Sequence, residues 1–325
     1  MKSFRQLPWL RISGLLLSGL FLYYCFHALS WAELRTAFAI PQPWLLAVAA
    51  LGNLAVLGFK TWVWQLLLKP SARIPFAFLF EAQHVGCMAN VLLPLKAGEF
   101  LKAGVVKKRY AVPYTQALTS IGLERYLAGF SLVLLALGLA LVFPLPAWIK
   151  TGALVMTLVL VAVQAGLFLL WQRHPDLEKW RSRHPWLYRI FQTLAHIGEG
   201  SQALRSWRTF LWLVLLSMLV WISEIAMLKV LELAYGLELS WAAPVLVLVA
   251  INLAIALPSA PGNLGAFEIA TVLAYTGLGL DKATALGIAV YFHVLQILPV
   301  TALGLFFYFR WGLRAKDWQG VPEGA

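Results

Sequence analysis

The residues of this chain best suited to bind a ligand lie at two breaks in otherwise apolar stretches, and each break is followed by a lone glutamate. The first break contains Pro94, Lys96, Gly98 and Glu99. The second contains Pro258, Pro261, Gly262, Asn263, Gly265 and Glu268. Because proline removes a backbone donor and clashes with the preceding turn, the sequence predicts that a helix ends at each break. We assign the structural breaks to Pro94, Gly98, Pro258 and Pro261.

Each break is a candidate site for a polar group. Freed backbone groups and a carboxylate are costly in hydrocarbon, so both breaks must face protein or water rather than lipid. A glycine-rich turn that leads into a helix also directs unpaired N–H groups and the positive end of the helix dipole outward. We therefore expect Gly262, Asn263 and Gly265 to present backbone amides to a phosphate-like headgroup, with Lys96 adding a positive charge.

Two adjacent charged residues, Glu124 and Arg125, lie inside a third apolar stretch. An arginine in a membrane span usually faces the protein interior. Arg125 could neutralise Glu99 or Glu268 in a shared headgroup site, or attract a lipid phosphate, and a purely structural buried ion pair fits the sequence as well. For Glu99 the alternative is an ion pair with Lys102 at the inner membrane surface.

We also assign an expected role to five other polar residues in apolar stretches. Glu224 lies too deep to reach the membrane surface easily, so we expect its carboxylate to face the cavity. Lys60 is expected to extend toward the inner surface. His293 is expected to make a hydrogen-bonded contact between helices, with a proton relay as the alternative. Asn90 and Asn252 precede the two breaks and are expected to bind backbone groups freed there.

The composition is that of an integral membrane protein. Of the 325 residues, 61% are hydrophobic and only 12% are charged, which is more apolar surface than a soluble domain of this size can bury. The formal net charge is +12, but the basic residues lie in short loops between apolar stretches. Membrane orientation and anionic lipid headgroups explain this charge better than nucleic acid, which we do not expect as a partner.

The hydropathy pattern predicts six spanning helices and two helical hairpins that enter the membrane and turn back. About 20 apolar residues suffice to cross a bilayer. The predicted spans cover residues 12–31, 43–68, 115–143, 151–172, 209–232 and 284–309. The predicted hairpins cover residues 76–106 and 241–280, because each is interrupted by one of the breaks. We therefore predict an all-α membrane protein with a single transmembrane domain over residues 1–325.

The distribution of basic residues predicts the orientation. Placing both termini in the cytoplasm puts most of the 26 Lys and Arg residues on the cytoplasmic side. The two hairpins then enter from opposite faces, so residues 1–145 and 146–325 form an inverted repeat, which places the site where the hairpin tips meet. The second half includes residues 173–207, predicted to be an amphipathic helix on the cytoplasmic surface, with a plain solvated linker as the alternative.

Sequence signatures of enzymes are absent. The chain contains no GxSxG, HExxH, P-loop or DxD motif, and its aspartates Asp176, Asp281 and Asp317 all lie in predicted loops. Cys25 and Cys87 lie in apolar stretches without metal-ligand spacing. We therefore expect no catalytic residues, no metal, no cofactor and no enzymatic activity.

Three segments together resemble a known family: Asn90–Glu99, Glu124–Arg125 and Leu257–Glu268. They are similar to the flippase-like transmembrane family typified by the membrane domain of lysylphosphatidylglycerol synthases, and the resemblance covers nearly the whole chain. It implies a polytopic inner-membrane protein that moves a lipid between leaflets. In that family an Asp commonly follows the Glu-Arg pair one turn later, whereas Ala128 and Gly129 stand here. No aminoacyl-transfer domain is attached, so the lipid need not be aminoacylated.

The sequence thus predicts a flippase of the bacterial inner membrane that moves a lipid with an anionic or glycosylated headgroup. The headgroup would enter a polar cavity between the hairpin tips while the acyl chains stay in the bilayer. Two alternatives remain open: a proton-coupled transporter of a small solute, using Glu268 or Glu224, and a non-transporting membrane partner of a lipid-synthesising or lipid-modifying enzyme. The membrane lipid is the expected substrate, and the oligomeric state is not predicted.

Overall fold

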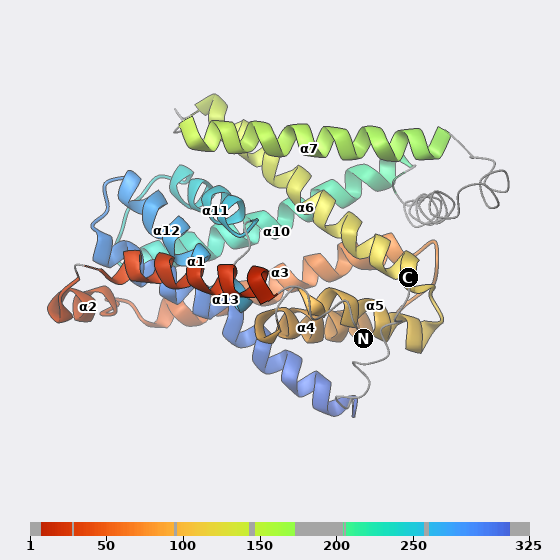
Figure 1. The fold of residues 1–325 in the computed structure, drawn as a ribbon, viewed down its shortest axis with the longest axis horizontal. Coiled ribbons are helices and arrows are strands. Elements are labelled where there is room, and N and C mark those ends of the chain that lie inside the picture. The colour runs from red at the N-terminus through yellow and green to blue at the C-terminus, as the bar shows by residue number, and fades with distance from the viewer. Residues whose placement is uncertain are drawn as a thin grey trace.

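The computed structural model describes residues 8–27, 29–93, 96–142, 147–172, 204, 206–256 and 260–312, and every regular element within them is helical (Figure 1). The long helices are α1 (Pro8–Phe26), α3 (Trp44–Leu68), α6 (Tyr114–Val142), α7 (Ala147–Gln172), α10 (Trp207–Ala234) and α13 (Lys282–Arg310). The shorter ones are α2 (Trp31–Ala37), α4 (Phe76–Leu92), α5 (Ala97–Tyr110), α11 (Ala242–Ala254), η3 (Pro261–Asn263) and α12 (Ala266–Gly277). The predicted all-α class is confirmed for this part of the chain. Pro94, Pro258 and nearly all of the predicted linker 173–207 lie outside it.

Four helices are long and apolar enough to cross a membrane. Their spanning segments are Trp44–Leu68, Tyr114–Leu141, Trp207–Ala234 and Lys282–Arg310. The two other predicted spans coincide with α1 and α7, and the part of these helices whose side chains the structure describes contains the apolar segments Leu16–Phe26 and Leu154–Val163. The chain is therefore an integral membrane protein, and four of its six predicted spans correspond to helices that are long and apolar enough to cross a bilayer.

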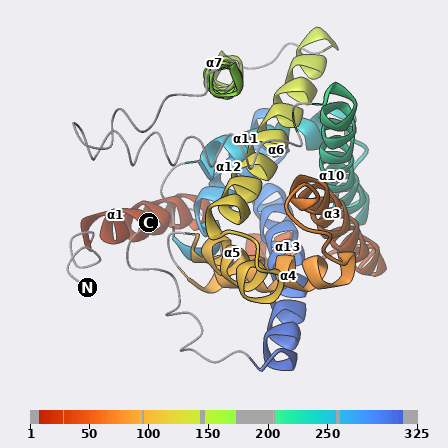
Figure 2. The ribbon, with the colours of Figure 1, turned by 90° about the vertical axis from the view of Figure 1, so that its right-hand side faces the viewer.

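Helices α3 and α10 lie side by side and make the most extensive helix–helix contact in the described part of the chain (Figure 2). Lipid tails are as apolar as leucine, so helices in a membrane associate mainly through close packing and internal hydrogen bonds. Gly52 of α3 permits such packing, since a Cβ there would lie 2.5 Å from Cγ of Met227 on α10. Nε1 of Trp221 then joins α10 to α6 by donating to the carbonyl oxygen of Ala128 at 2.9 Å.

The first break separates α4 and α5, which pack against each other as an antiparallel pair. Gly98 does not break a helix, contrary to prediction, because it lies in the first turn of α5. Its role is close packing: it faces the backbone of Gly86 on α4. Asn90 holds the two helices together, because its Oδ1 accepts a hydrogen bond of 2.8 Å from the Gly98 amide.

The second break separates α11 from α12 and contains the short helix η3, which begins at Pro261. Gly262 and Gly265 have φ angles of 70° and 85°, which glycine adopts without strain. Gly265 also lies against α1, where a Cβ would be 2.6 Å from the carbonyl oxygen of Ser18. The Ser18 hydroxyl accepts a 2.9 Å hydrogen bond from the Ala260 amide, so α1 fixes the position of this break.

The two helix pairs open at opposite ends of the molecule. The start of α4 and the ends of α5 and α13 share one apolar cluster, which includes Ile74, Tyr110 and Trp311. At the other end, the hydroxyl of Tyr275 near the end of α12 donates to Glu232 near the end of α10 at 2.9 Å. The pairs α4–α5 and α11–α12 therefore extend into the molecule from opposite ends.

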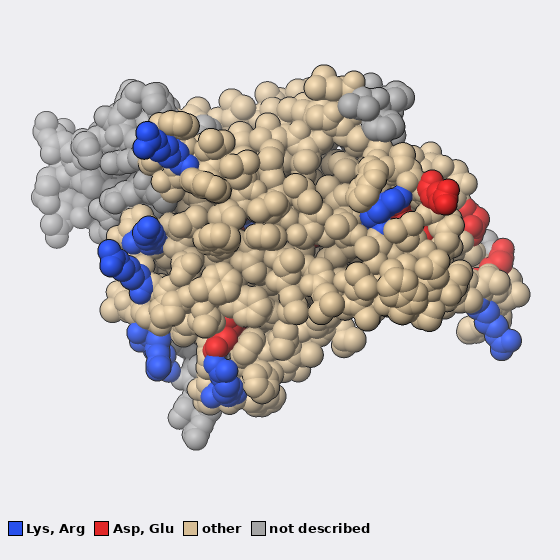
Figure 3. Space-filling view, turned by 180° about the vertical axis from the view of Figure 1, so that it is seen from behind, with Lys and Arg blue, Asp and Glu red and all other residues tan. Residues whose placement is uncertain are grey.

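Charged side chains on the face shown in Figure 3 lie at the two ends of the long axis, with a broad uncharged band between them. The last turn of α5 carries the basic cluster Lys107, Lys108 and Arg109, and the last turn of α13 carries Arg310. The opposite end carries both signs, including Glu33 and Arg35 on α2. An uncharged band bordered by charged ends is the surface expected of a chain that crosses a bilayer.

The contact between Gly98 and Gly86 predicts a steep cost for a small substitution. In Gly98→Ala the new methyl group would collide with the Gly86 carbonyl oxygen, so we expect a destabilisation of about 1–3 kcal/mol from overpacking. Gly104→Ala is the matched control in the same helix, because no atom lies within 4 Å of a Cβ there. It should stabilise the protein by about 0.5–1 kcal/mol. Denaturant unfolding in detergent micelles measures both, and equal effects would contradict the proposed packing role.

Candidate functional site

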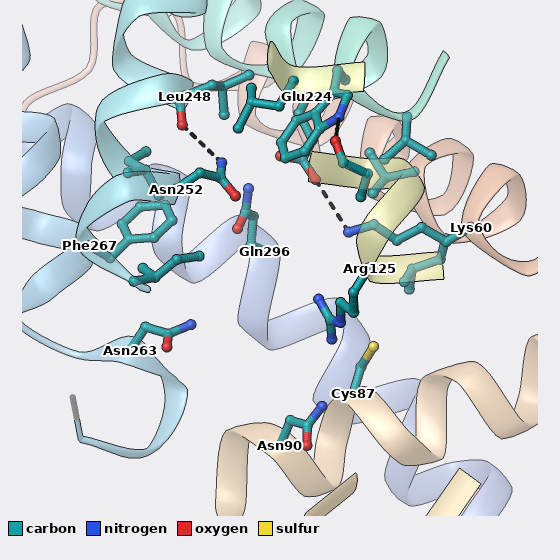
Figure 4. Close-up of a pocket in the computed structure, with 18 of the residues that line it drawn as sticks. Lys60, Cys87, Asn90, Arg125, Glu224, Leu248, Asn252, Asn263, Phe267 and Gln296 are labelled. Carbon is teal, nitrogen blue, oxygen red and sulfur yellow. Dashed lines mark hydrogen bonds and ion pairs between the residues drawn. The ribbon is translucent and has the colours of Figure 1, made fainter. Parts of the chain in front are cut away.

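A cavity of about 410 Å³ lies where the two breaks meet. The breaks approach each other closely, since a Cβ at Gly262 would lie 3.8 Å from the carbonyl oxygen of Val91. Helices α3, α4, α6, α10, α11 and α13 supply most of the wall (Figure 4). The cavity therefore occupies the position predicted for the site.

Most of the predicted site residues line this cavity. Those that do so are Lys96, Glu124, Arg125, Glu224, Gly262 and Asn263. Glu99, Gly265 and Glu268 do not line it. Glu99 and Glu268 instead lie one layer behind the wall, where each binds a residue that does line the cavity. The two glutamates that identify the breaks in the sequence thus support the wall rather than form it.

Arg125 projects from α6 into the cavity, as Figure 4 shows, and 57% of its side-chain surface is exposed there. Its guanidinium group forms an ion pair with Glu99, so it neutralises the carboxylate of the first break and not Glu268. Glu99 also accepts a 3.1 Å hydrogen bond from Asn90 Nδ2 and lies 3.8 Å from Nζ of Lys102. Glu99 is held inside the protein by three partners and is not confined to a pair with Lys102.

Glu124 points toward the protein interior on the α5 side. Its carboxylate accepts a 3.1 Å hydrogen bond from Lys102 Nζ and one of 3.2 Å from Gln83 Nε2. Lys102 is almost fully buried and lies over the ring of Trp64, 4.3 Å from its centroid. A buried carboxylate with two donors is already satisfied, so Glu124 is part of the structural support of the cavity.

Lys60 and Glu224 form an ion pair in the wall of the cavity, with 3.4 Å between Nζ and Oε1 (Figure 4). Glu224 faces the cavity as predicted. The prediction that Lys60 extends to the inner surface is wrong. Its helix α3 packs directly on α10, so an opposite charge lies within reach inside the protein. A lysine in a membrane span is expected to pair in this way when a partner is available.

Glu268 caps the start of α12, because its Oε2 accepts a 2.6 Å hydrogen bond from the Gly265 amide. That amide is therefore occupied, and the prediction that Gly265 binds a headgroup is wrong. The other oxygen, Oε1, lies 2.5 Å from Nδ1 of His293. Nε2 of His293 lies 2.8 Å from the carbonyl oxygen of Gly262. His293 thus makes the predicted contact between helices and lines the cavity as well.

The asparagines near the breaks act differently from each other. Asn90 binds freed backbone as predicted, whereas Asn252 donates to Leu248 in its own helix at 2.8 Å and also lines the cavity (Figure 4). A third asparagine, Asn53, was not predicted to take part. Its Nδ2 donates to the carbonyl oxygen of Leu295 at 3.3 Å. That oxygen lies four residues before Pro299, which has no N–H to bind it, so a proline within an apolar span is the signal for this contact.

Comparison with known proteins gives one family and two similar relatives. The family described as lysylphosphatidylglycerol synthase TM region matches residues 11–304. A UPF0104 membrane protein of Methanothermobacter thermautotrophicus is 26% identical over 282 residues, covering 81% of this chain and 82% of the relative. A second UPF0104 membrane protein of that organism is 22% identical over 295 residues, covering 84% of this chain and 87% of the relative.

The buried pair of Lys102 and Glu124 can be tested by unfolding experiments. Lys102→Met removes one partner and leaves a buried carboxylate, so we expect a loss of about 3–5 kcal/mol of unfolding free energy. The double variant Lys102→Met, Glu124→Leu should recover most of that loss, because no charge is stranded. Lys107→Met, at an exposed position of the same helix, is the control and should change stability by less than about 0.5 kcal/mol. The single variant Glu124→Leu completes the comparison. If the losses of Lys102→Met and Glu124→Leu simply add up in the double variant, the two residues are not coupled.

Proposed function

This chain belongs to the lysylphosphatidylglycerol synthase TM region family, and from this we propose that it is a lipid flippase that moves a lipid with a polar headgroup between the leaflets of the inner membrane. The observation that carries the proposal is the cavity at the meeting point of the two breaks, lined by cationic and anionic side chains in the middle of apolar helices. Ionisable groups inside membrane spans mark the path of a polar substrate.

The helix pairs beside the cavity support an entry route from either face. Helices α4, α5, α11 and α12 contain 17, 14, 13 and 12 residues, which is fewer than the roughly 20 needed to cross a bilayer. We propose that both pairs are re-entrant hairpins, with α4–α5 entering from the cytoplasm and α11–α12 from the other side. The basic ends of α5 and α13 support this orientation, because basic residues are enriched on the cytoplasmic side of a membrane protein. Oppositely oriented hairpins of this kind are the arrangement expected of an inverted repeat.

The size of the cavity suits a headgroup. A volume of about 410 Å³ lies within the range typical of small-molecule sites, about 300–1,000 Å³. The acyl chains would remain in the surrounding lipid and would not enter the cavity that holds the charged residues. Apolar side chains such as Leu132, Leu248 and Ile297 line the rest of the wall, so the polar part of the site is localised.

The charges of the cavity favour an anionic headgroup. Lys60 pairs with Glu224 and Arg125 pairs with Glu99. Lys96 lines the cavity without an ion-pair partner among the described residues. An ammonium group in a membrane cavity is stabilised by an anion. A phosphate or similar group of the lipid would therefore give Lys96 an ion-pair partner.

Reconstitution into liposomes tests the proposed function. The probes are fluorescent, acyl-labelled phosphatidylglycerol, phosphatidylethanolamine and a glucosyl lipid, and a membrane-impermeant quencher measures their exchange between leaflets. We expect the protein to accelerate exchange of at least one anionic or glycosylated probe over empty liposomes. Exchange no faster than in empty liposomes for every probe would contradict the proposal and favour a solute transporter or a non-transporting partner of a lipid-modifying enzyme.

Lys96 should select the headgroup. In Lys96→Gln we expect about tenfold slower exchange of labelled phosphatidylglycerol, because one charge-assisted hydrogen bond of about 1.5–3 kcal/mol is lost. Exchange of an uncharged glucosyl lipid should change less, and Lys96→Arg should retain most of the activity. Lys107→Gln is the control, since Lys107 lies on the adjoining helix α5 but is exposed outside the cavity. An equal loss for charged and uncharged probes would show that Lys96 does not read the headgroup charge.

A further inference from the structure

Glu268 and His293 form a buried titratable pair that the proposed headgroup site does not use. Each residue is 5% exposed. The ring of Phe267 stacks on the imidazole with its centroid 4.1 Å away, so the pair is shielded on that side. His293 still reaches the cavity, which gives the pair contact with the space where the headgroup would lie.

The hydrogen bonds of His293 and Glu268 determine which of their atoms carry a hydrogen. Nε2 of His293 faces the carbonyl oxygen of Gly262 at 2.8 Å, and because a carbonyl only accepts, Nε2 must carry a hydrogen. Nδ1 lies 2.5 Å from Oε1 of Glu268, a distance that requires a proton between the two atoms. The other carboxylate oxygen already accepts from the Gly265 amide.

We propose that Glu268 and His293 together bind one proton, and that this proton keeps the second break in place. Release of the proton would remove the hydrogen bond from His293 to the Gly262 carbonyl oxygen. The proton between Nδ1 and Oε1 belongs to the pair, whether it rests on the imidazole or on the carboxyl group. In both cases the pair as a whole is neutral, which is the favourable state for buried ionisable groups.

Loss of the proton breaks one of the two histidine contacts. A neutral imidazole has a single N–H, so it can donate either to the Gly262 carbonyl or to the Glu268 carboxylate, but not to both. The hydrogen bond to an anionic carboxylate is the stronger of the two. The remaining hydrogen therefore moves to Nδ1, and the Gly262 carbonyl loses its donor.

The freed residue lies where movement would alter the cavity. Gly262 lines the cavity and lies against Val91, in the last turn of α4 just before the first break. Its positive φ is readily exchanged for other conformations, because glycine has no Cβ to restrict it. Proton binding at the pair is thus linked to the arrangement of the two breaks around the headgroup site.

The surrounding charges couple the proton to an anion. The other ionisable side chains that line the cavity are Lys60, Cys87, Lys96, Glu124, Arg125 and Glu224. Behind the pair, Cys25 of α1 is close enough to interact electrostatically with Glu268. Cations across the cavity disfavour an added proton, and an anionic headgroup that neutralises them favours it. If the proposed lipid transport is correct, headgroup and proton therefore bind together, each raising the affinity for the other.

The proton site can be tested without transport. Infrared difference spectra of the purified full-length protein between acidic and alkaline pH should contain carboxyl and imidazole bands of the pair. These bands should be lost in Glu268→Gln and in His293→Gln. The amide introduced by Glu268→Gln can still donate to Nδ1 and accept from the Gly265 amide, so that variant should keep the fold. Glu232→Gln is the control, because Glu232 is a fully buried carboxyl that hydrogen-bonds Tyr275 outside the cavity, and it should retain the bands. Bands that persist in both site variants would overturn the proposal.

Coupling is measured in liposomes with labelled phosphatidylglycerol and an imposed pH gradient. With one proton per lipid, a gradient of one pH unit should shift the steady-state leaflet ratio by up to about tenfold, since one unit corresponds to about 1.4 kcal/mol. In Glu268→Gln the ratio should stay near one. Exchange that is fast but insensitive to the gradient would overturn the coupling and leave the flippase proposal standing. Absence of exchange for phosphatidylglycerol and for the other probes alike would refute the flippase proposal, while the infrared bands would still decide the proton site.

Discussion

The structure depends on one constraint: backbone groups freed where a helix breaks inside an apolar protein must find partners within the protein. At the first break Asn90 accepts from the Gly98 amide. At the second, the Ser18 hydroxyl accepts from the Ala260 amide, and His293 binds the Gly262 carbonyl. Each partner is a polar side chain on a helix that borders the break. Side chains of the helices that border the breaks therefore help to fix the positions of the breaks.

The ion pairs around the cavity follow from the same packing. Lys60 meets Glu224 because α3 packs on α10, and Arg125 meets Glu99 because α5 packs on α6. Pairing across helices lowers the cost of placing these charges in a membrane. It also fixes the positions of the charged groups, so a headgroup would meet a largely preorganised site, to which Lys96 adds a cation that has no ion-pair partner among the described residues.

The sequence predicted what depends on local chemistry and missed what depends on packing. Helix limits and breaks follow from hydropathy and proline, and the structure places them within a few residues of prediction. The pair of Lys60 and Glu224 joins residues 164 positions apart, so no local pattern reveals it. The occupied amide of Gly265 was predictable, because a glutamate three residues after a helix start commonly caps it, as Glu268 does here.

The two breaks have similar geometry, but the glutamates that follow them have different partners. At the first break the glutamate pairs with an arginine that remains charged at any accessible pH, so its charges are fixed. At the second break the glutamate pairs with a histidine, whose charge changes with a single proton. Because the breaks touch at Val91 and Gly262, a fixed charge pair and a titratable pair border one cavity. An arrangement with two fixed pairs would bind an anion equally well, but it would offer no means of linking that binding to a proton.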